Sequence, residues 1–403
     1  MANYKSEELG SAAAGRVPKA AYLLTGCIGV IGANSLVLGP IAPEVALSLS
    51  TNVSTIMLAA SAFGLGTALS ALFLAHHIDR LGAVRVLKMC LILLAIALLS
   101  SAVAPTAASL IAAQLVVGLI AGIALPAIYS SAIAVAPSGL ESKVVSVVLT
   151  GWTISMVAGV SLSVVLSEVL GWRAVYGIIA VLSLAAWYGL SKVKITDKVS
   201  KQSLPMPLTA INLPGIKPLL LCCFAFMGAF YGLYGFIGDY LHNALGLPIL
   251  ANSLIALIYG LGFGCAIIFN PITQRVAAKL LLTIVLAIVA FLYLTLAKLG
   301  GYASTMYIIL FLLGIVNHLA VNLLIVRLTD IDPNKRGTIM GLYSAVTYIG
   351  VFIGTSSYGQ IYLHYGFSAL AYTSMALTVI AAIIGQLGQR SRSAESIQQK
   401  LVQ

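Results

Sequence analysis

Long apolar segments, separated by short charged stretches, make up most of this chain of 403 residues. Ten long windows contain no Asp, Glu, Lys or Arg: 20–43, 45–78, 89–140, 144–167, 174–191, 218–238, 240–274, 280–297, 299–326 and 337–389. A helix needs about 20 apolar residues to cross the ~30 Å hydrocarbon core of a bilayer, so most windows predict one crossing. Windows 89–140 and 337–389 are long enough for two, and they are interrupted at Ala104-Pro105-Thr106 and at His364-Tyr365-Gly366. The pattern predicts an all-α membrane protein with twelve transmembrane helices.

The composition supports this prediction and orients the helices. Hydrophobic residues make up 60% of the chain and charged residues 8%, whereas a soluble protein carries about 25% charged residues. If the N-terminus is cytoplasmic, 20 of the 22 Lys and Arg residues fall in inner loops and tails, and only Arg173 and Lys298 fall outside. Cytoplasmic loops carry such an excess of basic residues, so we predict that both termini are cytoplasmic. Because the bases are scattered through short loops, they do not form a nucleic-acid-binding patch.

The longest polar stretch between predicted spans divides the chain into two parts. Residues 191–217 combine several lysines with three prolines, and proline together with charge disfavours a buried helix. We predict a cytoplasmic linker here, between a six-helix half at 20–190 and another at 218–389. Residues 1–19 and 390–403 are then cytoplasmic tails.

The two predicted halves also resemble each other. In the first half a glycine-rich span begins at Gly151, and the next span opens at Gly171 before a tryptophan. In the second half a glycine-rich span begins at Gly341, and the next opens at Gly366 before a phenylalanine. Glycine is common in membrane helices generally, but a repeat within six-plus-six spans is typical of transporters built from duplicated halves.

The loop between the second and third predicted spans, AHHIDRLGAVRVLK (75–88), resembles the signature loop of the major facilitator superfamily. The matching positions are Asp79, Arg80, Gly82 and Arg85. The resemblance implies a fold of two pseudo-symmetric six-helix halves, and a charged latch at these positions that holds the inner gate shut in the outward-facing state. An Asp at a helix boundary does pair readily with Arg and with helix termini. The alternative is a basic loop that only orients the protein.

Two further segments are similar to the drug/proton antiporter branch of that superfamily. The first span ends in LGPIAPEVA, which contains Pro40 and Pro43, and the fifth has Gly151 and Gly159 at positions of the branch's helix-packing motif. Within the branch, the chain looks most like the sugar-efflux and arabinose-induced exporters. The resemblance also implies a monomer in a bacterial inner membrane.

One position departs from the family pattern. The fourth span commonly has an arginine four residues before a glycine, and the arginine has been tied to proton coupling, but here the pair is Gln114 and Gly118. Because glutamine carries no charge, an arginine relay is absent and proton coupling stays open. The candidate coupling groups are His318, because the unperturbed pKa of a histidine lies near 6.5, and Asp239 at the predicted outer end of the seventh span.

The resemblance implies that spans 1, 4, 7 and 10 line a central cavity, so their polar and aromatic residues are candidate substrate contacts. These are Asn34, Gln114, Tyr129, Phe230, Tyr231, Tyr234, Asn317, His318 and Asn322. His318 and Asn322 are four residues apart and share one helix face. A histidine within the membrane usually faces a bundle interior or a wet cavity. The alternative for each candidate is packing between helices.

These observations predict a secondary transporter for a small neutral or weakly cationic organic compound. Keeping Lys or Arg deep in a span is expensive and none is found there, which argues against an obligate anion. Export by proton antiport is the first hypothesis, and a selective metabolite or siderophore importer, or a facilitator without proton coupling, is the alternative. A membrane-embedded enzyme or sensor is a remote alternative. The sequence has no nucleotide-binding glycine loop and no metal-ligand spacing, so we expect no cofactor, no metal and no catalytic residues.

Overall fold

The computed structural model describes residues 17–74, 78–137, 140–193, 206–269, 278–332 and 335–402, and every regular element in these ranges is helical. The α-helices are α2 (Lys19–Ser48), α3 (Val53–Phe73), α4 (Ile78–Leu81), α5 (Ala83–Ala102), α6 (Ala107–Val135), α7 (Glu141–Ile154), α8 (Ser161–Leu170), α9 (Trp172–Lys192), α10 (Ile216–Asp239), α11 (Ser253–Cys265), α13 (Ala278–Leu299), α14 (Ala303–Thr329) and α15 (Arg336–Val402). Shorter π-helices are η2 (Ser155–Val160) and η4 (Tyr240–Ala244), and 3₁₀-helices are η3 (Pro207–Asn212), η5 (Ile249–Asn252) and η6 (Ala266–Phe269).

The described helices account for twelve membrane crossings. Eleven helical segments in the described ranges are long and apolar enough to cross a membrane, and the last covers Arg336–Gln386. That segment contains Gly366, whose φ of 74° and ψ of −176° are not helical, so it holds two crossings. The other predicted break separates α5 from α6, where Thr106 and Ser109 cap the new helix reciprocally. The predicted all-α, twelve-helix fold is confirmed.

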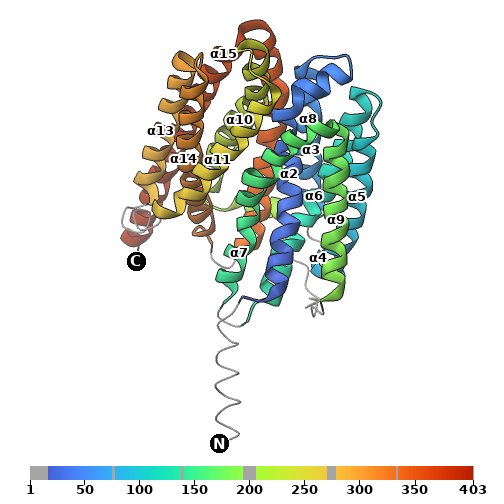
Figure 1. Cartoon of the computed structure of the whole chain (residues 1–403). Coiled ribbons are helices and arrows are strands. Elements are labelled where there is room, and N and C mark those ends of the chain that lie inside the picture. Colours follow the sequence, from blue (N-terminus) through green and yellow to red (C-terminus); the bar gives the residue numbers. More distant parts are fainter. Residues whose placement is uncertain are drawn as a thin grey trace, which may run out of the picture.

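The helices are grouped by their position in the chain. Figure 1 shows α2 to α9 (blue to green) on one side of the bundle and α10 to α15 (yellow to red) on the other. The most buried spans are α2 and α10, with 78% and 83% of their membrane windows buried. The first helix of each group therefore lies at the centre of the molecule, where the two groups meet.

The boundaries predicted for the halves remain predictions. Helix α9 ends at Lys192 and α10 begins at Ile216, while residues 194–205 of the predicted linker and 1–16 of the predicted N-terminal tail lie outside the described residues. Within the described part of the linker, η3 packs against α15. Helix α15 continues to Val402, past the predicted start of the C-terminal tail at 390.

Matching glycines mark the internal duplication. Where α3 crosses α6, a Cβ atom on Gly66 or Gly118 would collide with the main chain of the facing helix, and the same holds for Gly262 and Gly314 where α11 crosses α14. Gly262 follows Gly66 by 196 residues, and Gly314 follows Gly118 by the same 196. The second and fourth helices of each half therefore cross in the same way, because only glycine permits so close a backbone approach.

The contacts between the halves obey the same repeat. Gly39 of α2 and Gly235 of α10 are also 196 residues apart, and a Cβ on Gly39 would lie 3.2 Å from the Cα of Gly235. Gly64 packs against the main chain of α15, and its counterpart Gly260 packs against η2. These glycine contacts thus occur in pairs, as expected for two halves related by a pseudo-two-fold axis.

Candidate functional site

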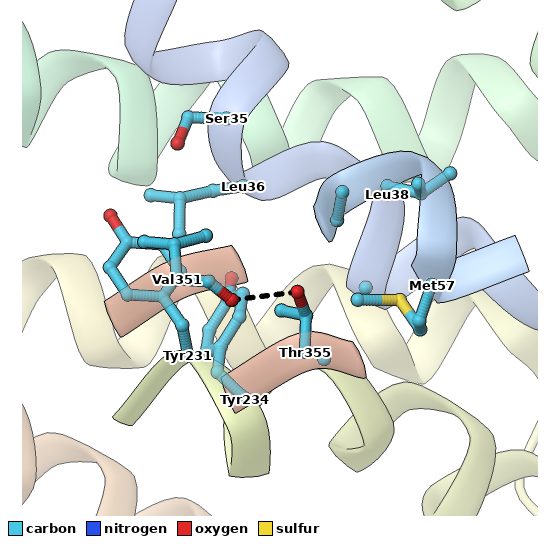
Figure 2. Close-up of a pocket in the computed structure, with 11 residues that line it drawn as sticks. Ser35, Leu36, Leu38, Met57, Tyr231, Tyr234, Val351 and Thr355 are labelled. Atoms are coloured by element: carbon cyan, nitrogen blue, oxygen red, sulfur yellow. Dashed lines mark hydrogen bonds between the residues drawn. The ribbon is translucent and has the colours of Figure 1, made fainter. Parts of the chain in front are cut away.

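A small cavity lies between the two halves, near the duplicated glycines Gly39 and Gly235. Its volume is about 10 Å³, room for about one water molecule. Figure 2 shows that both halves contribute to it, with Ser35 on α2 and Met57 on α3 across from residues of α10 and α15. The lining includes Ser35, Met57, Tyr231, Tyr234, Val351 and Thr355, and none of the residues that line it is charged.

Five aromatic side chains from α10 and α11 pack beside this cavity, and we call them the ring cluster: Phe230, Tyr231, Tyr234, Tyr259 and Phe263. The Phe230 ring stacks on Tyr259 with centroids 5.0 Å apart, and lies 5.1 Å from Tyr231 and 5.4 Å from Tyr234. Tyr259 in turn lies 6.3 Å from Phe263. These separations are those of attractive aromatic pairs, so the three rings predicted on α10 belong to a larger surface.

Three predicted residues of α14 continue this surface. The His318 ring meets Phe263 edge-on at 4.5 Å, and Asn317 donates from Nδ2 to the Tyr259 hydroxyl at 3.2 Å. His318 Nε2 lies 3.4 Å from Asn322 Nδ2, so the spacing of four residues brings these two side chains together.

Two polar atoms in this region lack partners. Asn317 Oδ1 and His318 Nδ1 are buried and make no hydrogen bond to any described residue. Buried polar atoms are rarely left unpaired. These two atoms of α14 are therefore free to hydrogen-bond a ligand.

Asn34 and Gln114 face each other instead of the cavity. Asn34 Nδ2 donates to Gln114 Oε1 at 3.1 Å, and Gln114 Nε2 donates to Asn34 Oδ1 at 3.4 Å and to Ser101 Oγ at 3.1 Å. The two amides are 5% and 2% exposed. This network ties α2 to α6 and α5, and it occupies the amide groups that the sequence offered as substrate contacts.

Tyr129, the remaining predicted contact, is half-buried on α6, and its hydroxyl interacts with the Trp152 side chain. Sequence reasoning missed Tyr259 and Phe263 because it considered only four spans as cavity-lining. The four-residue spacing of two rings in α11, directly after the aromatic span, was the available signal.

Asp239 lies outside the cavity, at the C-terminal end of α10. It is buried, and accepts hydrogen bonds from the Tyr362 hydroxyl and from Asn243 Nδ2, both at 2.6 Å. In the first half, Glu44 accepts hydrogen bonds from the Ser167 hydroxyl and, at 2.9 Å, from the main-chain N–H of Trp172.

These two carboxylates occupy similar positions, one residue away from the 196-residue register that Gly39 and Gly235 set on the same two helices. Asp239 follows Glu44 by 195 residues, and Tyr362 follows Ser167 by 195. We call each carboxylate and its hydroxyl partner an acid–hydroxyl clasp. Each clasp joins the C-terminal end of the first helix of a half to the C-terminal end of its fifth, so Asp239 connects two helices of one half in the structure.

The loop predicted as an inner latch is described only in part. Its backbone forms α4 and then turns at Gly82, where φ is 88°, into α5. A positive φ favours glycine, which explains the glycine at this position. The side chains of Asp79 and Arg80 lie outside the described residues, so the latch that they and Arg85 were expected to form stays a prediction.

The segments similar to the antiporter branch pack against one another. Helix α2 continues through Pro40 and Pro43, and the carbonyl of Pro40 accepts a hydrogen bond from Asn252 Nδ2 of the other half at 2.8 Å. A Cβ on Gly151 would meet main-chain atoms of α2, and one on Gly159 would lie 3.0 Å from a side chain of α2. After Gly151 the helix widens into η2, which contains Gly159, and π-helical turns of this kind are frequent at functional sites.

Comparisons with known proteins agree with this architecture. The family model of the Major Facilitator Superfamily matches residues 24–355. The chain is 26% identical over 375 residues, 90% of each protein, to the uncharacterized MFS-type transporter YwfA of Bacillus subtilis (strain 168). Its fold is similar to that of a D-xylose-proton symporter, with a TM-score of 0.75, 13% identity and coverage of 91% of this chain and 96% of that one. It is also similar to a bacterial homologue of the human lysosomal transporter Spinster, with a TM-score of 0.73, 17% identity and coverage of 92% and 96%.

Proposed function

Because the chain belongs to the major facilitator superfamily, we propose that it carries a small neutral or weakly cationic organic compound across the bacterial inner membrane by alternating access. The family makes the protein a transporter and not an enzyme. The observation that carries the proposed substrate class is the uncharged, aromatic lining of the cavity between the halves. Such a lining holds a ligand through ring contacts and a few hydrogen bonds.

The duplicated contacts supply a way to move. The halves meet through small residues and through single hydrogen bonds such as that between Ser61 and Thr355 at 2.6 Å. Contacts of this kind can separate while the glycine crossings keep each half intact. Rocking of one half against the other then exposes the cavity first to one side of the membrane and then to the other.

Export by proton antiport is our first choice for direction and coupling. It is supported by the branch-like packing of Gly151 and Gly159 on α2. His318 and Asp239 are the candidate coupling groups, and the loop containing Asp79, Arg80, Gly82 and Arg85 is the candidate inner latch. We further propose that the working unit is a monomer.

Uptake or facilitated diffusion is the second candidate, and the Asn34–Gln114 pair favours it. An amide pair binds no proton at physiological pH, so the position that carries an arginine in many family members cannot contribute to coupling here. The choice between the two candidates therefore depends on whether His318 or Asp239 binds the transported proton.

Transport by the purified protein in proteoliposomes tests both candidates. We expect counterflow of an organic substrate in the absence of a proton gradient. We expect faster export when protons move down their gradient in the direction opposite to the substrate. His318→Gln and Asp239→Asn separate the coupling groups, because loss of the pH response with retained counterflow identifies the one that couples. Counterflow with no response to pH in the unmodified protein would instead support the facilitator, and absence of counterflow for every compound class would contradict transport.

A further inference from the structure

The internal duplication gives many buried positions of one half a counterpart in the other. Along α2 and α3 the counterpart lies 196 residues later, on α10 and α11, as the glycine pairs show. Residues required by the shared packing are the same in both halves, as those glycines are. Residues that differ between the halves are not required by the fold and can serve a function of one half alone.

The ring cluster is such a difference. Its members Phe230, Tyr231, Tyr234, Tyr259 and Phe263 have as counterparts Asn34, Ser35, Leu38, Phe63 and Thr67. Four of the five counterparts carry no ring, although the helices that bear them cross in the same way. Packing of the fold alone therefore does not account for the cluster.

The arrangement of the cluster suits a flat ligand. Tyr231 and Tyr234 line the cavity, and the stacked pair of Phe230 and Tyr259 lies directly behind them. Aromatic faces attract other flat rings in stacked or edge-on contacts. With a volume of about 10 Å³ the cavity is too small for such a ring, so a ligand enters only when the halves part and then takes the place of contacts between them.

An unpaired polar atom specifies what the ligand must carry. Asn317 Oδ1 is a buried acceptor that receives no hydrogen bond from any described residue. A ligand with an N–H or O–H group satisfies Asn317, whereas one without such a group leaves that acceptor unpaired, and this is costly. None of the residues that line the cavity offers a charge to balance an ion.

We propose that the ring cluster is the specificity-determining surface of this protein, and that its substrate is a flat, uncharged heteroaromatic compound with at least one N–H or O–H donor. This inference rests on the proposed function, because it names the substrate class of the same site. In this proposal the two halves make different contacts with the ligand. The C-terminal half stacks on the aromatic ring of the ligand, and the N-terminal half contributes the Ser35 hydroxyl.

Thermal stability of the full-length protein in detergent tests the substrate class, since a bound ligand raises the melting temperature. The flat probes are theophylline, uracil and indole. Their matched controls are caffeine, 1,3-dimethyluracil and 1-methylindole, in which methyl groups replace the N–H donors, and D-xylose and D-glucose provide saturated rings. We expect stabilisation by at least one flat probe, with binding at least about fivefold weaker for its methylated control and no stabilisation by the sugars. Stabilisation by sugars alone, equal binding of a probe and its methylated control, or no stabilisation by any flat probe overturns the proposal.

Variants that replace a ring-cluster residue with its counterpart from the N-terminal half test whether the cluster is the binding surface. Tyr231→Ser and Tyr234→Leu each introduce the residue found at the duplicated position. We expect both proteins to fold, and to bind the flat probe about five- to tenfold more weakly. The matched control is Phe236→Leu. Phe236 lies on the same helix, and its buried ring packs on Tyr362, outside the cluster. This substitution should leave binding unchanged. Unchanged binding in both cluster variants would overturn the assignment of the surface.

Binding and counterflow measured on the unmodified protein and on these variants test the substrate class and the proposed transport separately. Counterflow of D-xylose without binding of flat probes leaves transport intact and overturns the substrate class. Binding of a flat probe that is lost in Tyr231→Ser, without counterflow of that probe, supports the surface and contradicts transport.

Discussion

The Asn34–Gln114 pair shows, at the residue scale, how one partner determines the role of another. Each amide alone is a polar group in an apolar helix, available to a ligand. Together, and with Ser101, they form a closed network in which the amides donate to and accept from one another. The two amides therefore hold α2, α5 and α6 together.

Removing one amide should expose this dependence. Gln114→Leu leaves the Asn34 amide and the Ser101 hydroxyl without their partner, and we expect a loss of about 1–2 kcal/mol in the free energy of unfolding. Unfolding in mixed detergent micelles measures it. In the double variant Asn34→Leu/Gln114→Leu the cost should be smaller than the sum of the single costs. Strict additivity would show that the two amides do not interact.

The crossing glycines allow a second prediction at this scale. Gly118→Val places a side chain against the main chain of α3, which cannot rotate away, so we expect a loss of about 3 kcal/mol or little folded protein. Gly314→Val should have the same effect in the other half. The control is Gly177→Ala on α9, where nothing lies within 4 Å of the added Cβ, and it should be neutral or stabilising by about 0.5–1 kcal/mol. Equal effects at all three positions would show that the helix crossings at Gly118 and Gly314 do not require glycine.

At the scale of helices, each acid–hydroxyl clasp joins the C-terminal ends of two helices in one half. Glu44 and Asp239 sit at the ends of α2 and α10, and their hydroxyl partners come from the fifth helix of the same half. A hydrogen bond to a carboxylate is stronger than one between neutral groups. The clasps therefore hold the first helix of each half to the fifth helix of the same half.

Removing one hydroxyl tests a clasp. Tyr362→Phe leaves Asn243 as the remaining hydrogen-bond partner of Asp239 among the described residues, and we expect a loss of about 1–3 kcal/mol in stability. Tyr372→Phe, on an exposed part of α15, is the matched control and should cost little. Thermal unfolding of the two variants gives the comparison, and similar melting temperatures would show that the clasp does not contribute.

The helices themselves were predictable because their signal is local. Charge-free windows of membrane-spanning length and the breaks at Thr106 and Gly366 follow from residues close together in the chain. The partners of a side chain are not local. Nothing in the sequence showed that Gln114 would turn to Asn34, or that α11 would add Tyr259 and Phe263 to the rings of α10, because these contacts depend on how the helices rotate about their axes.

At the scale of the molecule, transport requires the halves to separate, and one contact can test this. Ser61 of α3 and Thr355 of α15 hydrogen-bond across the interface at 2.6 Å, so cysteines at both positions lie close enough to form a disulfide. In a background without the five native cysteines, we expect Ser61→Cys/Thr355→Cys to transport when reduced and to stop when oxidised. Ser61→Cys alone should be insensitive to oxidant, and full transport by the cross-linked protein would show that this contact need not open.

The repeat of 196 residues has a consequence for how such a site could arise. Both halves begin on the same side of the membrane and run through six crossings, so one six-helix ancestor paired with its own copy accounts for both. Such a homodimer must present identical groups from its two subunits, and any ring on one face appears on the other as well. Once both copies are encoded in a single gene, each mutates independently. The rings could then accumulate beside Gly235 while an amide network formed beside Gly39, a division of labour that two copies of one gene product cannot achieve.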